Sequence, residues 1–402
     1  MTNPIACEIG KWSELPSFIE QYNHLIHSQG DGIGRIFGYA SIIGNHSAEK
    51  PAQSANIPNE KATLHGMEVA MNVYAAGQYE YRGTRDLENG IYNVGLYAGM
   101  EPALTEDGYA EGLNITVAPE DAAQSFKAYL KREIGNPPGD VDLDNLITQG
   151  ENGEILITEE GKAYFSTLAD SEKDDFGLYK LQVVNVTLDN NQVVPALSVS
   201  TNEKSPFSAI GLTPIQAAHY ILDGQGYERE VDGRALGGSA VDYFQNTLAS
   251  YEEFGVNQPR MREIAGSVIG MAEAYQAFDA AQKDSSKQAE LPDIASRLLN
   301  DAFTTELNGE KHFVSTRRFD DDLVDRGQPT ENVRQSNDLP RNGTDKISRI
   351  SGLLEDGALD EIRSVAEMLK KADTQEGISE QPATHATSNI TPSKGRDGSF
   401  QR

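Results

Sequence analysis

Residues 35–43 read RIFGYASII, a compact run of β-branched and aromatic residues. Such a run predicts a strand, and the polar stretch from Gly44 to Lys61, with its two prolines, predicts the long loop after it.

Further strands and helices are predicted on both sides of this run. Alternating apolar patterns predict strands at 64–84, 91–99, 112–119 and, around the turn Asp189-Asn-Asn, at 179–200. Amphipathic patterns predict helices at 11–28, 119–134, 213–226 and 239–256. The mixture of hairpin-linked strands and separate helices indicates an α+β fold.

The composition argues against several kinds of partner. The chain has 62 acidic and 34 basic residues, and its net charge of −28 repels a nucleic-acid backbone. With Cys7 as the single cysteine, no internal disulfide can form, which fits a reducing, cytoplasmic compartment. The first residues lack an apolar run long enough for a signal sequence or a membrane span. We expect neither nucleic acid nor membrane as a partner, and delivery into a host cell by a specialised secretion system stays open.

Other chemistries lack the residues that they require. The glycines within 30–34 imitate a dinucleotide loop, but Arg35 stands where the third glycine of that motif belongs. His24 and His27 have no third ligand nearby, so we predict no metal site. Cys7 is expected in a loose leader without a paired base, which argues against a thiol nucleophile.

Two parts of the chain differ from the rest in composition. Residues 135–178 are rich in Asp and Glu and show little apolar periodicity, which predicts an acidic insertion on the surface, outside the core. Residues 259–372 are expected to form a helical extension. Residues 373–402 are too poor in apolar side chains to order and are predicted to be a disordered tail. Residues 1–34 are expected to be a leader and a helix.

Several motifs occur in the order that is typical of ChaC-type γ-glutamylcyclotransferases. Phe37–Ile43 resembles that family's FGYGSLI, and residues 128–133, AYLKRE, resemble the helix that presents its catalytic glutamate. The other similar segments are Tyr81–Thr84 with Gly95-Leu96, Val194–Leu197, residues 206–221, Asp242–Asn246 and Glu253–Val256. The resemblance covers roughly residues 35–258.

The resemblance implies both a fold and an activity. The fold would be a small mixed β-barrel flanked by helices, with a helical and then disordered C-terminal extension. The activity would be that of a lyase that degrades glutathione to 5-oxoproline and Cys-Gly without metal or cofactor. Glu133 would be the catalytic carboxylate. The residues that would bind the substrate are Tyr39, Ala40, Ser41, Ile42, Ile43, Arg82 and Tyr179.

The chemistry needs only one base. In glutathione the α-amine can close a five-membered ring on the γ-carbonyl, so the substrate supplies both nucleophile and electrophile. A carboxylate removes the proton from the ammonium and returns it to the leaving Cys-Gly nitrogen. Main-chain amides in a tight loop after a strand can hold a carboxylate and stabilise an oxyanion, and by the resemblance those of Tyr39–Ile43, with Ser41, would form a cradle for the γ-glutamyl end. By the resemblance, too, Tyr179 would orient the catalytic carboxylate, and the Arg82 guanidinium would hold a substrate carboxylate.

Four departures from the family pattern leave alternatives open. Ala40 replaces a loop glycine, Ala240 replaces an asparagine, and about forty residues are inserted after Glu133. The helix is also one residue short, so an ungapped alignment places Ile134 at the catalytic position. The alternatives are an inactive γ-glutamyl-binding relative, and an interaction scaffold that uses the insertion or extension. An activating protein partner stays open, as does a bacterial effector role, and Glu120 and Glu154 are the next acids to consider.

Overall fold

The computed structural model describes the main part of the 402-residue chain. The described residues are 4–43, 60–77, 93–139, 141–169, 171, 173–205, 208–223, 229–231, 234–236, 240–290, 304–307, 310–313 and 350–376.

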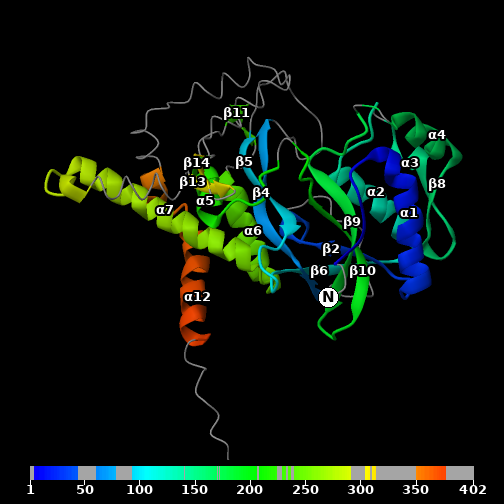
Figure 1. Ribbon diagram of the computed structural model, residues 1–402, viewed down its shortest axis with the longest axis horizontal. Helices are drawn as coiled ribbons and strands as arrows, with labels where there is room; N and C mark the ends of the chain where they lie inside the picture. The colour runs from blue at the N-terminus through cyan, green and yellow to red at the C-terminus, as the bar shows by residue number, and fades with distance from the viewer. Residues whose placement is uncertain are drawn as a thin grey trace, which may run out of the picture.

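A closed β-barrel lies at the centre of the molecule (Figure 1). Its strands are β2 (Gly34–Gly38), β3 (Glu60–His65), β6 (Tyr109–Val117), β9 (Tyr179–Leu188) and β10 (Val193–Thr201). The sheet runs in the order β9-β10-β2-β6-β3, and β3 pairs again with β9, which closes it. β10 and β2 are parallel while the other pairs are antiparallel. The predicted α+β fold, a small mixed β-barrel flanked by helices, is confirmed.

The first described residues extend this sheet. β1 (Ile5–Ile9) pairs antiparallel with the outer edge of β9, and Cys7 lies opposite Val183. The expectation of a loose leader is therefore wrong for these residues. Five alternating residues give a weak sequence signal, and here tertiary pairing with β9 decides their conformation.

Helices formed by residues 12–29 and 119–133, the second of which ends in the AYLKRE motif, lie on one side of the barrel. A 3-10 turn η1 (Trp12–Glu14), α1 (Leu15–Asn23) and the π-helical turn η2 (His24–Gln29) account for the predicted helix at 11–28. The turn η4 (Pro119–Asp121) leads into α2 (Ala122–Glu133), as the acids in its first turn predicted. α1 buries Leu15, Phe18, Ile19 and Tyr22.

Residues 135–178 also lie on this side, and they contribute to the core. They form α3 (Leu143–Leu146), β7 (Ile147–Gln149), the turn η5 (Glu151–Gly153), β8 (Ile155–Ile157) and α4 (Glu159–Leu168). Phe165 is fully buried, and the Asn23 side chain of α1 donates to the Ile155 carbonyl (2.7 Å) and accepts from its amide (3.1 Å). The prediction of a surface insertion outside the core is wrong. The segment's few apolar residues are spread too thinly among acids for a helical or strand period to be visible.

The opposite side of the barrel carries a second hairpin and three helices (Figure 1). The hairpin consists of β4 (Met67–Gly77) and β5 (Asn93–Pro102), with a bulge between Met71 and Val73. The helices are α5 (Pro214–Asp223), α6 (Ala240–Phe254) and α7 (Pro259–Lys283). α6 contacts the 3-10 turn η3 (Ala40–Ile42) that follows β2, so this side meets the barrel at the RIFGYASII loop.

The C-terminal helices pack on this second side. Residues 350–355 are helical, and α12 (Asp360–Glu376) contacts α6 and α7. α12 continues four residues into the predicted disordered tail, and the remainder of that tail lies outside the described residues. Among the described residues, no helix is long and apolar enough to cross a membrane. The remaining elements are β11 (Arg229–Val231), β12 (Arg234–Leu236), η6 (Gln288–Glu290), β13 (Thr304–Leu307) and β14 (Glu310–Phe313).

Candidate active site

Glu133 is the last residue of α2, and its carboxylate lies largely inside the protein. Its side chain is only 13% exposed, and Oε1 pairs with Nε of the neighbouring Arg132 at 2.8 Å. Burial raises the pKa of the Glu133 carboxyl above its ordinary value, and the Arg132 guanidinium opposes part of that rise. Ile134, the C-cap residue, packs at the edge of the core. A carboxylate that is partly desolvated in this way is a stronger base than one on the surface.

Tyr39 and Tyr179 both lie close to this carboxylate. Tyr39 follows β2 and its hydroxyl donates to the Val199 carbonyl at 3.0 Å, while Tyr179 begins β9 and donates to the Ala98 carbonyl at 3.3 Å. Burial raises the pKa of both phenols well above the usual value, and the nearby Glu133 charge adds to the rise. Because each hydroxyl donates its proton to a carbonyl, each leaves its oxygen lone pairs to accept from a ligand.

Further tyrosines, which were not among the site residues predicted from the sequence, complete the cluster. Tyr129 is fully buried and lies four residues before Glu133, so both side chains share one face of α2. Tyr243 and Tyr251 are about two turns apart on α6, and Tyr243 packs against Tyr97 with ring centroids 4.8 Å apart. The helical spacing of Tyr129 from Glu133, and of Tyr243 from Tyr251, is a sequence signal that could have identified these three as site residues. No signal in the sequence identifies Tyr97.

The turn after β2 has a strained conformation at Ala40. Its φ is +49°, in the left-handed region that favours glycine, at the position where the resembled family has glycine. Within the turn, the Ile42 amide donates to the Tyr39 carbonyl and the Ile43 amide to the Ala40 carbonyl. The last two amides of the predicted cradle are therefore already engaged. Its remaining candidate donors are Ser41 and Ala40, whose main chain also interacts with the Tyr251 hydroxyl.

The remaining site residues considered from the sequence are Arg82, Ser41, Glu120 and Glu154. Arg82 lies outside the described residues, and for Ser41 only the backbone is described. Glu120 and Glu154, the alternative acids, are both exposed. Of the acids considered from sequence, Glu133 is the one that the fold buries beside the tyrosines.

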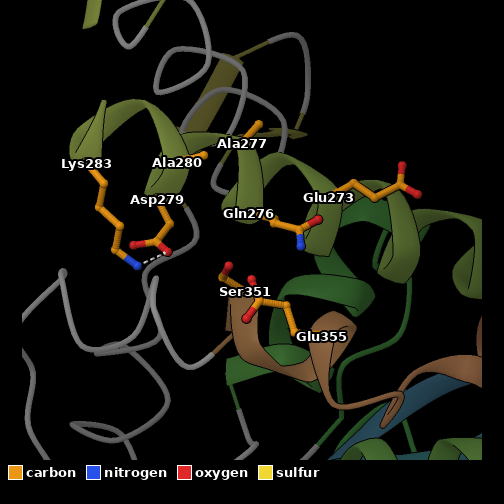
Figure 2. A pocket seen from close by; sticks show the side chains of 8 residues that line it. All are labelled: Glu273, Gln276, Ala277, Asp279, Ala280, Lys283, Ser351 and Glu355. Atoms are coloured by element: carbon orange, nitrogen blue, oxygen red, sulfur yellow. Dashed lines mark hydrogen bonds and ion pairs between the residues drawn. The ribbon is translucent and has the colours of Figure 1, made fainter. Parts of the chain in front are cut away.

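A cavity elsewhere in the structure has a different character. It has a volume of about 440 Å³ and lies between α7 and the helical residues 350–355 (Figure 2). Its lining residues are Glu273, Gln276, Ala277, Asp279, Ala280, Lys283, Ser351 and Glu355, and Asp279 is paired with Lys283 at 2.6 Å. None of these residues belongs to the tyrosine cluster, so we place the candidate site at Glu133.

The described ranges hold no group of three or more His, Cys, Asp or Glu side chains that could bind a metal ion. What the cluster offers is one partly desolvated carboxylate, phenol oxygens and main-chain amides. These groups can transfer a proton and hold a polar substrate.

Comparison with known proteins gives only a distant likeness. No protein-family model and no curated protein matches the chain. A solved structure of a γ-glutamyl cyclotransferase specific to glutathione, from yeast, shares 13% sequence identity at a TM-score of 0.33 and covers 59% of this chain and 98% of its own. The selenomethionine-labelled form of the yeast protein gives the same identity and TM-score and covers 96% of its own chain. At this level the likeness carries no conclusion about function.

Proposed function

We propose that the protein is a γ-glutamylcyclotransferase that degrades glutathione to 5-oxoproline and Cys-Gly. The observation that carries the proposal is the Glu133 carboxylate, 13% exposed at the end of α2, with a raised pKa and with Tyr39 and Tyr179 beside it. A surface glutamate at a helix C-terminus has neither the burial nor the polar neighbours that this one has.

The proposed reaction uses Glu133 first as base and then as acid. The carboxylate takes a proton from the substrate α-ammonium, and the freed amine attacks the γ-carbonyl carbon to form the new ring C–N bond. The amide C–N bond to the cysteine then breaks, and Glu133 returns the proton to the leaving nitrogen. The ring nitrogen keeps one hydrogen in the product, so its extra proton passes through the same carboxylate to the Cys-Gly amine, which leaves as an ammonium. Atoms balance without water, because 5-oxoproline and Cys-Gly together contain all the atoms of glutathione.

A raised pKa suits both halves of this cycle. The base must accept a proton from an ammonium and then donate it to an amine that is leaving, so a carboxyl closer to neutrality performs both steps better than an ordinary one. The Arg132 pairing favours the ionised form of Glu133 and so lowers its pKa against the larger effect of burial. Burial raises the pKa of Glu133, and the ion pair with Arg132 lowers it.

The other residues would position the substrate. The hydroxyls of Tyr39 and Tyr179 donate to main-chain carbonyls, so their lone pairs would accept from the substrate ammonium. The main-chain amides of Ala40 and Ser41 would stabilise the negative charge on the γ-carbonyl oxygen. Arg82 remains a proposal from sequence as the partner of a substrate carboxylate.

The experiment is direct detection of the products. Purified full-length protein is incubated with glutathione, and 5-oxoproline and Cys-Gly are measured by mass spectrometry in equal amounts over time. We expect the same rate with EDTA, because the proposed cycle uses no metal. Absence of 5-oxoproline over a wide range of glutathione concentrations, also with cell extract added as a source of an activator, would favour the inactive-scaffold alternative.

A further inference from the structure

A second buried carboxyl, Glu101, lies on the hairpin side of the molecule. It belongs to β5 and is only 1% exposed. Its Oε2 accepts a hydrogen bond from the Asn72 side-chain amide at 2.8 Å and another from the Gly211 main-chain amide at 3.3 Å. A buried carboxyl is costly unless it is bonded in this way, so its donors hold it in one orientation.

Asn72 joins this carboxyl to the barrel. It is the extra residue of the bulge in β4, between Met71 and Val73, and is 1% exposed. Its amide oxygen accepts from the Thr201 hydroxyl of β10 at 2.7 Å. Bulges re-aim single side chains, and this one turns the Asn72 amide to bond both Glu101 and the barrel strand.

The chain makes room for these bonds at Gly99. A Cβ there would lie 2.1 Å from the Thr201 hydroxyl oxygen and 2.3 Å from the Asn72 amide oxygen, far inside any tolerated contact. Any side chain at this position would therefore separate Asn72 from Thr201. The glycine allows β5 to lie directly against the Asn72–Thr201 bond.

The network adjoins the candidate active site at Thr201 and at Ala98, the residue next to Gly99. Thr201 pairs across the sheet with Tyr179. Ala98, next to Gly99 and opposite Met71 beside the bulge, accepts from the Tyr179 hydroxyl at 3.3 Å, and its amide donates to the Tyr243 hydroxyl oxygen at 3.3 Å. The position of the Ala98 main chain thus sets where two tyrosines of the cluster lie.

We propose that Asn72, Glu101 and Thr201 form a clamp that fixes the Ala98 main chain and thereby positions Tyr179 and Tyr243 for the reaction. The three are positioning residues, since Glu101 acts through Asn72 and Ala98 rather than on the substrate. The proposal rests on the proposed function for its kinetic effect, but the clamp itself can be measured without any substrate.

The surroundings of Glu101 favour its neutral form. Glu68 lies directly across from it on β4, and Arg260 and Glu263 face the same region from α7. Burial is the largest effect and raises the pKa of Glu101, while the hydrogen bonds from Asn72 and Gly211 oppose that rise. The charge of Glu68 adds a weaker contribution to the rise, and Arg260 opposes it. A glutamine at this position keeps an oxygen that can accept from Asn72 and Gly211 and carries no charge. Glu101→Gln is therefore the conservative variant, and Glu101→Ala is the disruptive one.

The test compares four variants in the full-length protein: Thr201→Val, Glu101→Ala, Glu101→Gln and Thr116→Val. Thr201→Val removes one hydroxyl at constant shape, and Thr116→Val does the same to a buried threonine of β6 that pairs with Arg35. The readouts are hydrogen exchange of the Ala98 amide by NMR, kcat and KM for glutathione, and the unfolding temperature.

We expect Thr201→Val to speed exchange at Ala98 and to lower kcat by about threefold to tenfold, which is the range of one net hydrogen bond. Glu101→Ala should have a larger effect, Glu101→Gln a smaller one, and Thr116→Val should leave both readouts at the parent values. If Glu101→Ala fails to fold, the Ala98 exchange rate and the kcat of Thr201→Val still test the proposal.

Two results would overturn the proposal. Unchanged exchange at Ala98 in Thr201→Val would show that no clamp exists, and faster exchange with parent kcat would show that the clamp does not position the tyrosines. If the parent does not turn over glutathione, faster exchange in Thr201→Val but not in Thr116→Val would retain the clamp while the proposed function is lost.

Discussion

Glu133 and Glu101 are two buried glutamates with raised pKa values on opposite sides of one tyrosine cluster. Glu101 is 1% exposed and bonded by the neutral donors Asn72 and Gly211, so it is held in a single orientation. Glu133 is 13% exposed, pairs with the adjacent Arg132, and has phenols rather than amides near it. Burial alone is therefore common to both and cannot distinguish a catalytic carboxylate from a structural one.

The difference lies in access to a ligand. Oε2 of Glu101 is fixed by a backbone amide and a strand side chain, and its Oε1 is buried without a hydrogen-bond partner among the described residues, so a ligand cannot reach this carboxyl. The Glu133 carboxylate is partly exposed and lies near the hydroxyls of Tyr39 and Tyr179, which donate their protons to carbonyls, so a substrate ammonium would find acceptors on more than one group. A group that must gain and lose a proton during turnover needs that freedom.

The largest expected effect separates the two glutamates by turnover. Glu133→Gln keeps the size of the side chain and removes the base, so the rate of 5-oxoproline formation should fall by about 10²-fold or more, as loss of general acid-base catalysis does. Glu101→Gln should reduce the rate far less, and Glu154→Gln, at an exposed acid, should not change it. The rates are measured under saturating glutathione, with thermal unfolding as the check on folding. A Glu133→Gln variant as active as its parent would remove the catalytic assignment.

The second-largest effect is expected in residues 135–178, which pack against α2, the helix that ends at Glu133. Gln149 of this segment accepts from the Ala123 amide in the first turn of α2 at 2.8 Å, and so caps the helix that carries Glu133. Phe165→Ala removes a fully buried ring from the same segment and should cost about 3–5 kcal/mol of unfolding free energy. Leu156→Ala, whose side chain is 42% exposed, is the control and should cost little. Urea unfolding measures the unfolding free energy of both variants. Equal unfolding midpoints for Phe165→Ala and Leu156→Ala would mean that residues 135–178 are a surface insertion outside the core.

The sequence predicted the barrel better than it predicted the site. Strong alternation in 179–200 and the turn at Asp189-Asn-Asn located a hairpin that the structure has as β9 and β10. The acidic segment was misjudged because Leu146, Ile155 and Phe165 follow no helical or strand period, and β8 and α4, which carry the last two, acquire a partner only when α1 folds against them. Tyr97 and Glu101 could not be found, since their roles depend on how one hairpin docks on the barrel.

A third effect tests how the charge of Glu133 is balanced. Arg132 lowers the pKa of Glu133 against the larger opposing effect of burial, so Arg132→Gln should raise that pKa further. The base must be ionised to act, so activity falls as the pH drops through its pKa. The acidic limb of the kcat/KM profile should therefore move to higher pH in Arg132→Gln and stay in place in Lys131→Gln, at the exposed neighbour. An unmoved limb would mean that another group titrates in the reaction.

The smallest effect is expected at Ala40, where three contributions oppose one another. Ala40→Gly relieves a left-handed backbone worth about 1–2 kcal/mol, but it loses the burial of one methyl group, about 0.8 kcal/mol, and adds about 0.5–1 kcal/mol of chain entropy to the unfolded state. The net change in unfolding free energy should lie within about 1 kcal/mol of zero. In Ala40→Val no favourable contribution offsets the backbone strain, because a β-branched residue tolerates a positive φ least. This variant should therefore unfold at a clearly lower temperature than the parent. Calorimetry of the two variants beside the parent measures this. Equal unfolding temperatures for all three would mean that the turn beside Glu133 is not held in the left-handed conformation, and its Ala40 amide would then point elsewhere than at the proposed oxyanion.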